Sequence, residues 1–304
     1  MNRKSFIAQL AGSSAAVLLS GADLWKPSEL IKKAVAKTGE SIPAVGMGSW
    51  ITFDIDDSAS SLQPMRSVLK EFVQSGGRVI DSSPMYGRSE KVIGQLASEL
   101  GIADLLWIAT KVWTSGEQPG KNQINNSARL FRKWPTLLQV HNLQDWKTHL
   151  KTIRGLKESG KIKYVGITHY IDEMHREMAG IIKSESLDFI QVNLSINNRA
   201  AEDYLLPLAA DKQVSVIINK PFETGALFSA VDGKALPAFA AALGINTWAA
   251  YFLKYIISHP AVTCAIPATS KVEHLRQNMA ACYGALPDTA MRRRMVEYFN
   301  SVAR

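Results

Sequence analysis

The chain has 304 residues, of which 46% are hydrophobic and 20% are charged, and this ordinary globular composition excludes an intrinsically disordered protein. The formal net charge is +8, but the basic residues are scattered and are not interleaved with aromatic side chains, so the charge does not indicate a surface for nucleic acid. The length lies within the range of a single α/β barrel.

Residues 1–22 have the features of an export signal in the expected order. Arg3 and Lys4 precede a short apolar run rich in Ala, Ser and Gly, and the small residues at 20–22 suit cleavage by a signal peptidase. The sequence RKSFI at 3–7 resembles the bacterial twin-arginine signal, with Lys in place of the second Arg. The run is too short and too polar to span a membrane permanently. We expect export to the periplasm; the alternative is a leader helix on a cytoplasmic protein.

From residue 41 onward, short apolar runs alternate with segments whose apolar residues recur at helical spacing. The predicted strands cover 44–48, 78–81, 106–111, 137–141, 164–168, 189–193, 215–220 and 263–267. The predicted helices include 62–73, 92–100, 121–134, 146–156, 171–183, 201–212, 243–258, 271–283 and 288–302. Strand-then-helix order favours parallel strands. A doubly wound dinucleotide-binding sheet is expected to carry a GxGxxG motif after its first strand, and this chain has none there. We therefore predict one α/β domain, a (β/α)8 TIM barrel over residues 41–304.

The polar residues that close the predicted strands are candidates for the site, because active sites of TIM barrels lie at the C-terminal ends of the strands. The second, third and fourth strands end at Asp81, Lys111 and His141, which bring a carboxylate, an ammonium and an imidazole to one rim. The other strands end at Ser49, Trp50, Thr168, His169, Gln191, Asn193, Asn219, Lys220, Thr269 and Ser270.

Tyr86 lies on the loop after the second predicted strand, close enough to return over this rim. Asp81 and Lys111, on neighbouring strands, can form an ion pair. An ammonium beside a tyrosine hydroxyl stabilises the phenolate and lowers its pKa, which makes the tyrosine a usable proton donor and acceptor near neutral pH. We predict that Asp81 positions Lys111 and that Lys111 lowers the pKa of Tyr86.

Metal ligands are not predicted. The six histidines and the two cysteines, Cys264 and Cys282, show no metal-binding spacing. Cys264 lies in an apolar run and is interpreted as a small core residue.

These motifs, in their order and spacing, resemble those of the aldo-keto reductase family over residues 41–285. The matching segments are Asp81 with Tyr86-Gly87, ATK at 109–111, LQVHN at 138–142, GKIKYVG at 160–166, FIQVN at 189–193, and IP at 266–267 with QN at 277–278. The resemblance implies reversible hydride transfer between a nicotinamide cofactor and an aldehyde or ketone. The family's tetrad falls on Asp81, Tyr86, Lys111 and His141; Tyr86 would protonate the developing alkoxide, and His141 would orient and polarise the carbonyl.

The resemblance also implies where a cofactor binds, and it favours NADPH over NADH. Ser49 and Trp50, after the first strand, are candidate cofactor contacts. Thr168-His169 takes the place of a Ser-Asn pair that holds the nicotinamide carboxamide, with Gln191 as its companion. Phe222 lies near the place of the aromatic ring that stacks on the nicotinamide, or packs as a core aromatic residue. The implied adenosine contacts are Thr269, Ser270, Lys271, Arg276, Gln277 and Asn278, with His274 in place of an arginine common in the family.

The substrate is expected to be a small carbonyl compound. Trp50, Met85 and Trp113 suit apolar walls around an aromatic or aliphatic carbonyl compound, or ordinary packing at the rim. Two other functions stay open: a cofactor-binding regulatory or sensor protein with little turnover, and an unrelated barrel enzyme such as a hydrolase using His141 and Asp81. The complete tetrad favours the reductase, because a protein that only binds a cofactor does not need all four groups.

Overall fold

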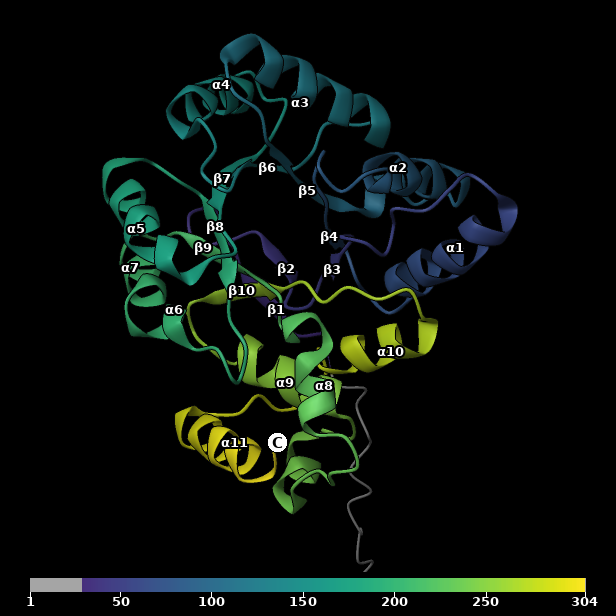
Figure 1. Ribbon diagram of the computed structural model, residues 1–304, viewed down its shortest axis with the longest axis vertical. Coiled ribbons are helices and arrows are strands. Elements are labelled where there is room, and N and C mark those ends of the chain that lie inside the picture. Colours follow the sequence, from purple (N-terminus) through teal and green to yellow (C-terminus); the bar gives the residue numbers. More distant parts are fainter. Residues whose placement is uncertain (1–28, 304) are drawn as a thin grey trace, which may run out of the picture.

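Eight parallel strands form a ring with helices around it in the computed structural model, which describes residues 29–303 (Figure 1). The predicted export signal lies outside the described residues. Parallel bridges from Val45 to Ala265 and from Gly48 to Ala268 join the first strand of the ring to the last. The predicted TIM barrel is therefore confirmed. The strands are β3 (Met47–Gly48), β4 (Val79–Asp81), β5 (Trp107–Val112), β6 (Leu137–His141), β7 (Tyr164–Thr168), β8 (Phe189–Asn193), β9 (Ser215–Asn219) and β10 (Val262–Ala265).

The helices follow the strands as predicted, with three differences, the first of which is a short helix at Ala226–Ala230 that was not predicted. The segment 201–212 forms two short helices, and the helix predicted from 243 begins only at Trp248. Gly244 has φ 65° and ends a 3-10 turn, and the Thr247 side chain then caps the helix by accepting a hydrogen bond from the Ala250 N–H. The helices are α1 (Ala59–Gln74), α2 (Ser89–Glu99), α3 (Glu117–Phe131), α4 (Trp146–Glu158), α5 (His175–Ser184), α6 (Ala200–Asp203), α7 (Leu205–Asp211), α8 (Ala226–Ala230), α9 (Trp248–Ile257), α10 (Val272–Ala280) and α11 (Thr289–Val302).

Apolar residues at helical spacing hold the helices against the barrel. In α1, Leu62, Met65, Leu69 and Phe72 are buried and belong to the main core. Each such side chain contributes about 1.5–3 kcal/mol when it is withdrawn from water. Ser58 fixes the start of α1, because its hydroxyl accepts a hydrogen bond from the Ser61 N–H.

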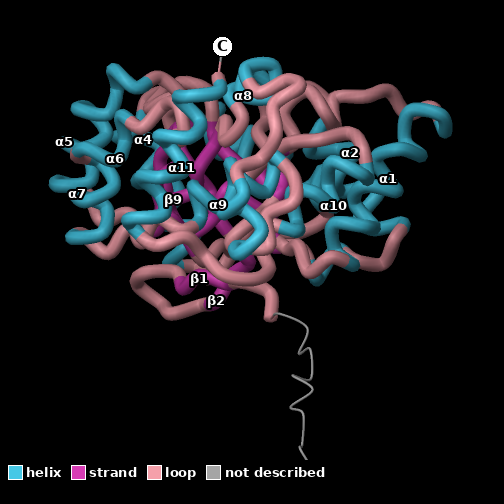
Figure 2. Tube along the Cα trace, turned by 90° about the horizontal axis from the view of Figure 1, so that it is seen from below, coloured by secondary structure: helices cyan, strands magenta, loops and turns pink. Residues whose placement is uncertain are grey.

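An antiparallel hairpin of β1 (Lys32–Ala34) and β2 (Ser41–Pro43) lies at one end of the barrel, opposite α8 (Figure 2). Its Ile42 packs in one cluster with Trp107 and Tyr164 from the barrel interior. The hairpin was not predicted, because its strands have three residues each and the first carries two lysines. It covers the end of the barrel at which the strands begin, so the opposite end remains open for a site.

Two further features concern membranes and metals. Within residues 29–303, no helix combines the length and apolar character that crossing a membrane requires, and no group of three or more His, Cys, Asp or Glu residues is arranged to hold a metal ion. Cys264 and Cys282 are free, buried thiols, and Cys264 is a core residue as predicted.

Candidate active site

A cavity of about 710 Å³ opens at the end of the barrel where the strands finish. Every strand of the ring, or the residues directly after it, contributes to the wall. The residues that line it from the strand ends are Gly48, Ser49, Asp81, Lys111, His141, Thr168, Gln191, Asn219 and Ile266. Loops supply the remaining wall, including Tyr86, Tyr170 and Phe222. The four predicted catalytic residues thus line one cavity.

Asp81 and Lys111 form a buried ion pair at the floor of this cavity. The Lys111 ammonium donates to Oδ2 of Asp81 at 2.6 Å and to the Ser82 carbonyl at 2.7 Å, and the side chains of Lys111 and Asp81 are 1% and 3% exposed. Burial, the largest single effect, favours the neutral amine, but the charge of Asp81 acts together with Tyr86 and with hydrogen bonds to both residues, and their sum raises the pKa of Lys111 above its usual value. Lys111 therefore remains a cation at all ordinary pH values.

Tyr86 lies beside this cation on a tight turn after β4. The Lys111 Nζ is 5.0 Å from the centroid of the Tyr86 ring, and the ring meets the His141 imidazole edge to face at 5.7 Å. The turn depends on Gly87, which has φ 56°, and a Cβ there would lie 2.2 Å from Asp54 Oδ1. Asp54 in turn accepts a hydrogen bond from the Arg88 N–H at 2.9 Å. The loop carrying Asp54 is thereby fastened to the loop carrying Tyr86.

The predicted direction of the Tyr86 pKa is wrong in this structure. Burial raises the pKa of Tyr86 above its usual value; the positive charge of Lys111 opposes this effect without reversing it. The sequence identified the neighbouring charge but gave no measure of how far the hydroxyl is withdrawn from water. Tyr86 consequently carries its proton at neutral pH and can act as a proton donor.

His141 closes β6 and is neutral. Burial, and then the charge of Lys111, lower the pKa of His141 to about 2. Its Nδ1 lies 2.9 Å from the Ser83 hydroxyl, a contact that the sequence analysis missed. An imidazole that stays uncharged is suited to donating a hydrogen bond to a carbonyl oxygen, and not to supplying a net proton.

The predicted nicotinamide-side residues divide into two groups. Ser49, Trp50, Thr168, Gln191 and Phe222 all line the cavity. His169 does not: its Nδ1 accepts a hydrogen bond from the Ile171 N–H at 3.1 Å, and its ring stacks on Tyr170 at 5.7 Å. This arrangement therefore does not support the prediction that His169 contacts the cofactor. The neighbouring residue Tyr170 lines the cavity instead of His169.

Several oxygen atoms in the cavity wall lack hydrogen-bond partners within the described chain. They are Ser49 Oγ, Thr52 Oγ1, Asp81 Oδ1, Asn142 Oδ1 and Asn219 Oδ1, each of them buried. Buried polar atoms without partners are costly, so their concentration in one wall indicates a ligand that carries hydrogen-bond donors. A carboxamide and ribose hydroxyls have this chemistry, and the cavity residues thus fit a nicotinamide nucleotide.

The predicted adenosine-side residues lie beyond the cavity, whose wall extends along this segment only to Ala268. Thr269 accepts a hydrogen bond from the Lys271 N–H at 3.1 Å, and Ser270 and Lys271 are exposed at the start of α10. Two other predicted adenosine contacts, Gln277 and Asn278, lie within α10. Arg276 forms a two-point ion pair with Glu71 of α1 at 2.9 and 3.0 Å. Arg276 is thus already engaged, while Lys271 forms no ion pair in residues 29–303.

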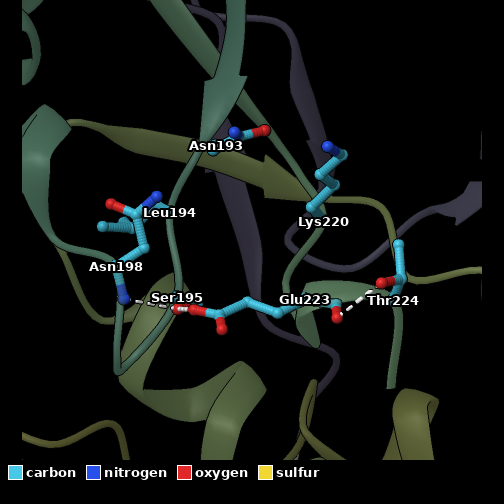
Figure 3. Close-up of a pocket in the computed structure, with 7 residues that line it drawn as sticks. All are labelled: Asn193, Leu194, Ser195, Asn198, Lys220, Glu223 and Thr224. Atoms are coloured by element: carbon cyan, nitrogen blue, oxygen red, sulfur yellow. Dashed lines mark hydrogen bonds between the residues drawn. The ribbon is translucent and has the colours of Figure 1, made fainter. Parts of the chain in front are cut away.

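Lys220 is a second cation of the cavity wall, and no carboxylate lies within 4.0 Å of its ammonium in the described chain. Its Nζ lies 4.4 Å from the centroid of the Tyr170 ring. Lys220 also borders a smaller cavity of about 220 Å³, whose wall includes Ser195, Glu223 and Thr224 (Figure 3). There the Glu223 carboxylate accepts a hydrogen bond from Ser195. Glu223 does not line the large cavity, and Lys220 brings to that cavity a cation that forms no ion pair in residues 29–303.

Large apolar side chains surround the mouth of the cavity. Trp50, Ile51, Met85 and Phe228 line it and are 48%, 64%, 41% and 38% exposed. Trp113, predicted with them, is exposed but lies outside the wall. Exposed apolar groups gathered at a cavity mouth suit an apolar ligand.

Comparison with known proteins identifies a family and a set of relatives. The model of the aldo/keto reductase family matches residues 44–294. An uncharacterized oxidoreductase of Bacillus subtilis, YqkF, is 25% identical over 257 residues, covering 71% of this chain and 81% of its own. An NADH-specific methylglyoxal reductase of Escherichia coli is 24% identical over 247 residues, covering 69% and 73%.

Solved structures share the fold. An aldo/keto reductase from Klebsiella pneumoniae, in complex with NADP and acetate, superposes with a TM-score of 0.74 at 23% identity, covering 89% of this chain and 96% of its own. The aldo-keto reductase AKR11C1 from Bacillus halodurans gives 0.71 at 19% identity, with the same coverage.

Proposed function

The chain belongs to the aldo/keto reductase family, and on that premise we propose that it is an NADPH-dependent oxidoreductase that reduces an aldehyde or ketone to an alcohol. The observation that carries this proposal is the convergence of Asp81, Tyr86, Lys111 and His141 on one cavity. A hydride acceptor needs a proton donor beside its oxygen and a positive charge that stabilises the donor once it is deprotonated. This cavity provides both.

Each residue has a separate task in the reduction. NADPH, when bound, supplies the hydride that adds to the carbonyl carbon. Neutral His141 donates a hydrogen bond to the carbonyl oxygen, and Tyr86 transfers its proton to that oxygen as the C–O double bond becomes single. The Lys111 ammonium stabilises the resulting phenolate, and Asp81 keeps the ammonium in place. One hydride and one proton thus convert the carbonyl compound into the alcohol.

The residues that would hold the cofactor follow from the cavity wall. Thr168, Gln191 and Asn219 offer polar groups for the carboxamide, and Phe222 offers an apolar ring. Lys220 is placed to pair with a phosphate group, since it is a cation of the wall without a carboxylate partner in the described chain. A helix N-terminus with exposed Lys271 follows Ala268 and suits a further phosphate.

NADPH is favoured because Lys271 remains available for a 2′-phosphate. The relatives differ in this respect: the Klebsiella structure contains NADP, whereas the Escherichia coli enzyme is described as NADH-specific. Arg276 supports the choice less than predicted, because Glu71 already pairs with it.

Turnover distinguishes the reductase from a cofactor-binding sensor on the same barrel. Purified protein should be mixed with NADPH and a panel of aromatic and aliphatic aldehydes and ketones, and cofactor absorbance followed. We expect oxidation of NADPH that depends on the carbonyl compound and is fastest with apolar substrates, which match Trp50, Met85 and Phe228. Tight NADPH binding without turnover on any member of the panel would favour the sensor.

We also propose export to the periplasm through residues 1–22. The support is the order of basic residues, apolar run and small residues in the sequence. Residues 1–30 should be fused to a reporter that folds before export, with a matched fusion in which Arg3 and Lys4 are both changed to Gln. Export of the first fusion and retention of the second are expected; retention of both, uncleaved, would favour the cytoplasmic alternative.

A further inference from the structure

Ser83 is a fully buried residue that joins the backbone of the Tyr86 turn to the His141 ring. Its hydroxyl oxygen is 2.9 Å from Nδ1 of His141, and the same oxygen accepts a hydrogen bond from the Met85 N–H at 3.3 Å. The Ser83 carbonyl also accepts from the Tyr86 N–H at 3.0 Å. One residue therefore contacts both the turn that carries the proton donor and the imidazole beside it.

These contacts decide which ring nitrogen of His141 carries the proton. A neutral imidazole has one N–H, and a serine hydroxyl has one proton to donate. The Ser83 oxygen already accepts from Met85, and its proton has no acceptor other than Nδ1 among residues 29–303. If Nδ1 instead carried the hydrogen, the serine proton would remain buried without a partner, which is costly. Ser83 is therefore the donor and Nδ1 the acceptor.

The opposite nitrogen, Nε2, then carries the ring proton. The ring lines the cavity, and Nε2 has no hydrogen-bond partner within the described residues. An Nε2–H group there is a donor for the carbonyl oxygen; the other tautomer would present a lone pair and repel that oxygen.

We propose that Ser83 is a positioning residue that holds His141 in the neutral Nε2–H tautomer required for carbonyl binding. The catalytic effect of this tautomer rests on the proposed function, whereas the tautomer itself can be observed in the free protein. Because Ser83 is two residues beyond Asp81 and three before Tyr86, the same turn orders the donor and the imidazole together.

The test combines nitrogen NMR with kinetics on the full chain. In protein labelled with 15N-histidine, protonated and unprotonated ring nitrogens have well-separated shifts, and the His141 signals are identified by their loss in His141→Gln. We expect wild type to show Nε2 protonated and Nδ1 bare, and Ser83→Ala to show a mixture of tautomers. Carbonyl reduction by Ser83→Ala should fall on the order of 10-fold, the effect of about one hydrogen bond, with NADPH affinity changed less than about 2-fold. Ser83→Thr, which keeps the hydroxyl, should restore the wild-type tautomer.

Ser215→Ala is the matched control. Its hydroxyl is also buried and accepts a backbone N–H, from Ala36 at 2.8 Å, but it lies where β9 begins, at the hairpin end of the barrel. We expect Ser215→Ala to leave the His141 signals and the rate unchanged. A wild-type His141 with its proton on Nδ1, or a Ser83→Ala variant with unaltered tautomer, would overturn the proposal. If the tautomer responds to Ser83 but no carbonyl compound is reduced, the positioning role stands and the proposed function fails.

Discussion

The Lys111 ammonium and the Asp81 carboxylate are 2.6 Å apart, and both are withdrawn from water. A buried pair of this kind contributes little net stability, but removal of one partner leaves an uncompensated charge. The pair therefore makes the catalytic cation dependent on Asp81.

Lys111→Met should lower the free energy of unfolding by about 3–5 kcal/mol, because Asp81 is then buried without a partner. Asp81→Asn combined with Lys111→Met should recover most of this loss, as the double variant buries no charge. Urea denaturation of the wild type, Lys111→Met and the double variant measures both effects. If the double variant is less stable than Lys111→Met, the two residues are not an interdependent pair.

The pH dependence should follow Tyr86 and not His141. Reduction needs the protonated tyrosine, and the raised pKa of Tyr86 keeps it protonated throughout neutral pH. The pKa of His141 is about 2, so this residue does not titrate there. We expect kcat/KM for reduction to be constant from about pH 6 to 9, while alcohol oxidation, which needs the phenolate, rises with pH by up to about tenfold per unit. A step in the reduction profile near pH 6.5 that is absent in His141→Gln would contradict the neutral imidazole.

Much of this site could be predicted because parallel strands of a barrel end at one rim. Asp81, Lys111 and His141 were found from their places after apolar runs, and all three line the cavity. The direction of the Tyr86 pKa was not predictable, because it depends on how deeply the finished turn buries the hydroxyl.

Other contacts depend on long-range packing or on local backbone geometry. Arg276 forms an ion pair with Glu71, which is 205 residues away in the sequence, and no local sequence pattern could have predicted this contact. His169 turns out of the cavity because its ring accepts the Ile171 N–H. Ser83 has the sequence appearance of an ordinary residue after a strand, and only the fold brings His141 to its hydroxyl.

Cofactor preference should depend on Lys271 more than on Arg276. Lys271→Ala should weaken NADPH binding by about 1.5–3 kcal/mol, roughly 10- to 100-fold, and leave NADH binding nearly unchanged. Fluorescence titration of both cofactors measures this, with Lys212→Ala, an exposed lysine directly after α7, as the control. Equal losses for the two cofactors would show that Lys271 does not recognise the 2′-phosphate.

The central claim is that Tyr86 donates the proton to the reduced carbonyl. The most direct measurement is the single-turnover rate of NADPH oxidation by Tyr86→Phe with the best carbonyl substrate, together with the NADPH affinity of the same variant. Tyr204→Phe, an exposed tyrosine outside the cavity, is the control. Tyr86→Phe is expected to lose a factor of about 10²–10⁴ in rate, with NADPH affinity within about 2-fold of wild type and Tyr204→Phe unaffected. Reduction by Tyr86→Phe at the wild-type rate would contradict the assignment.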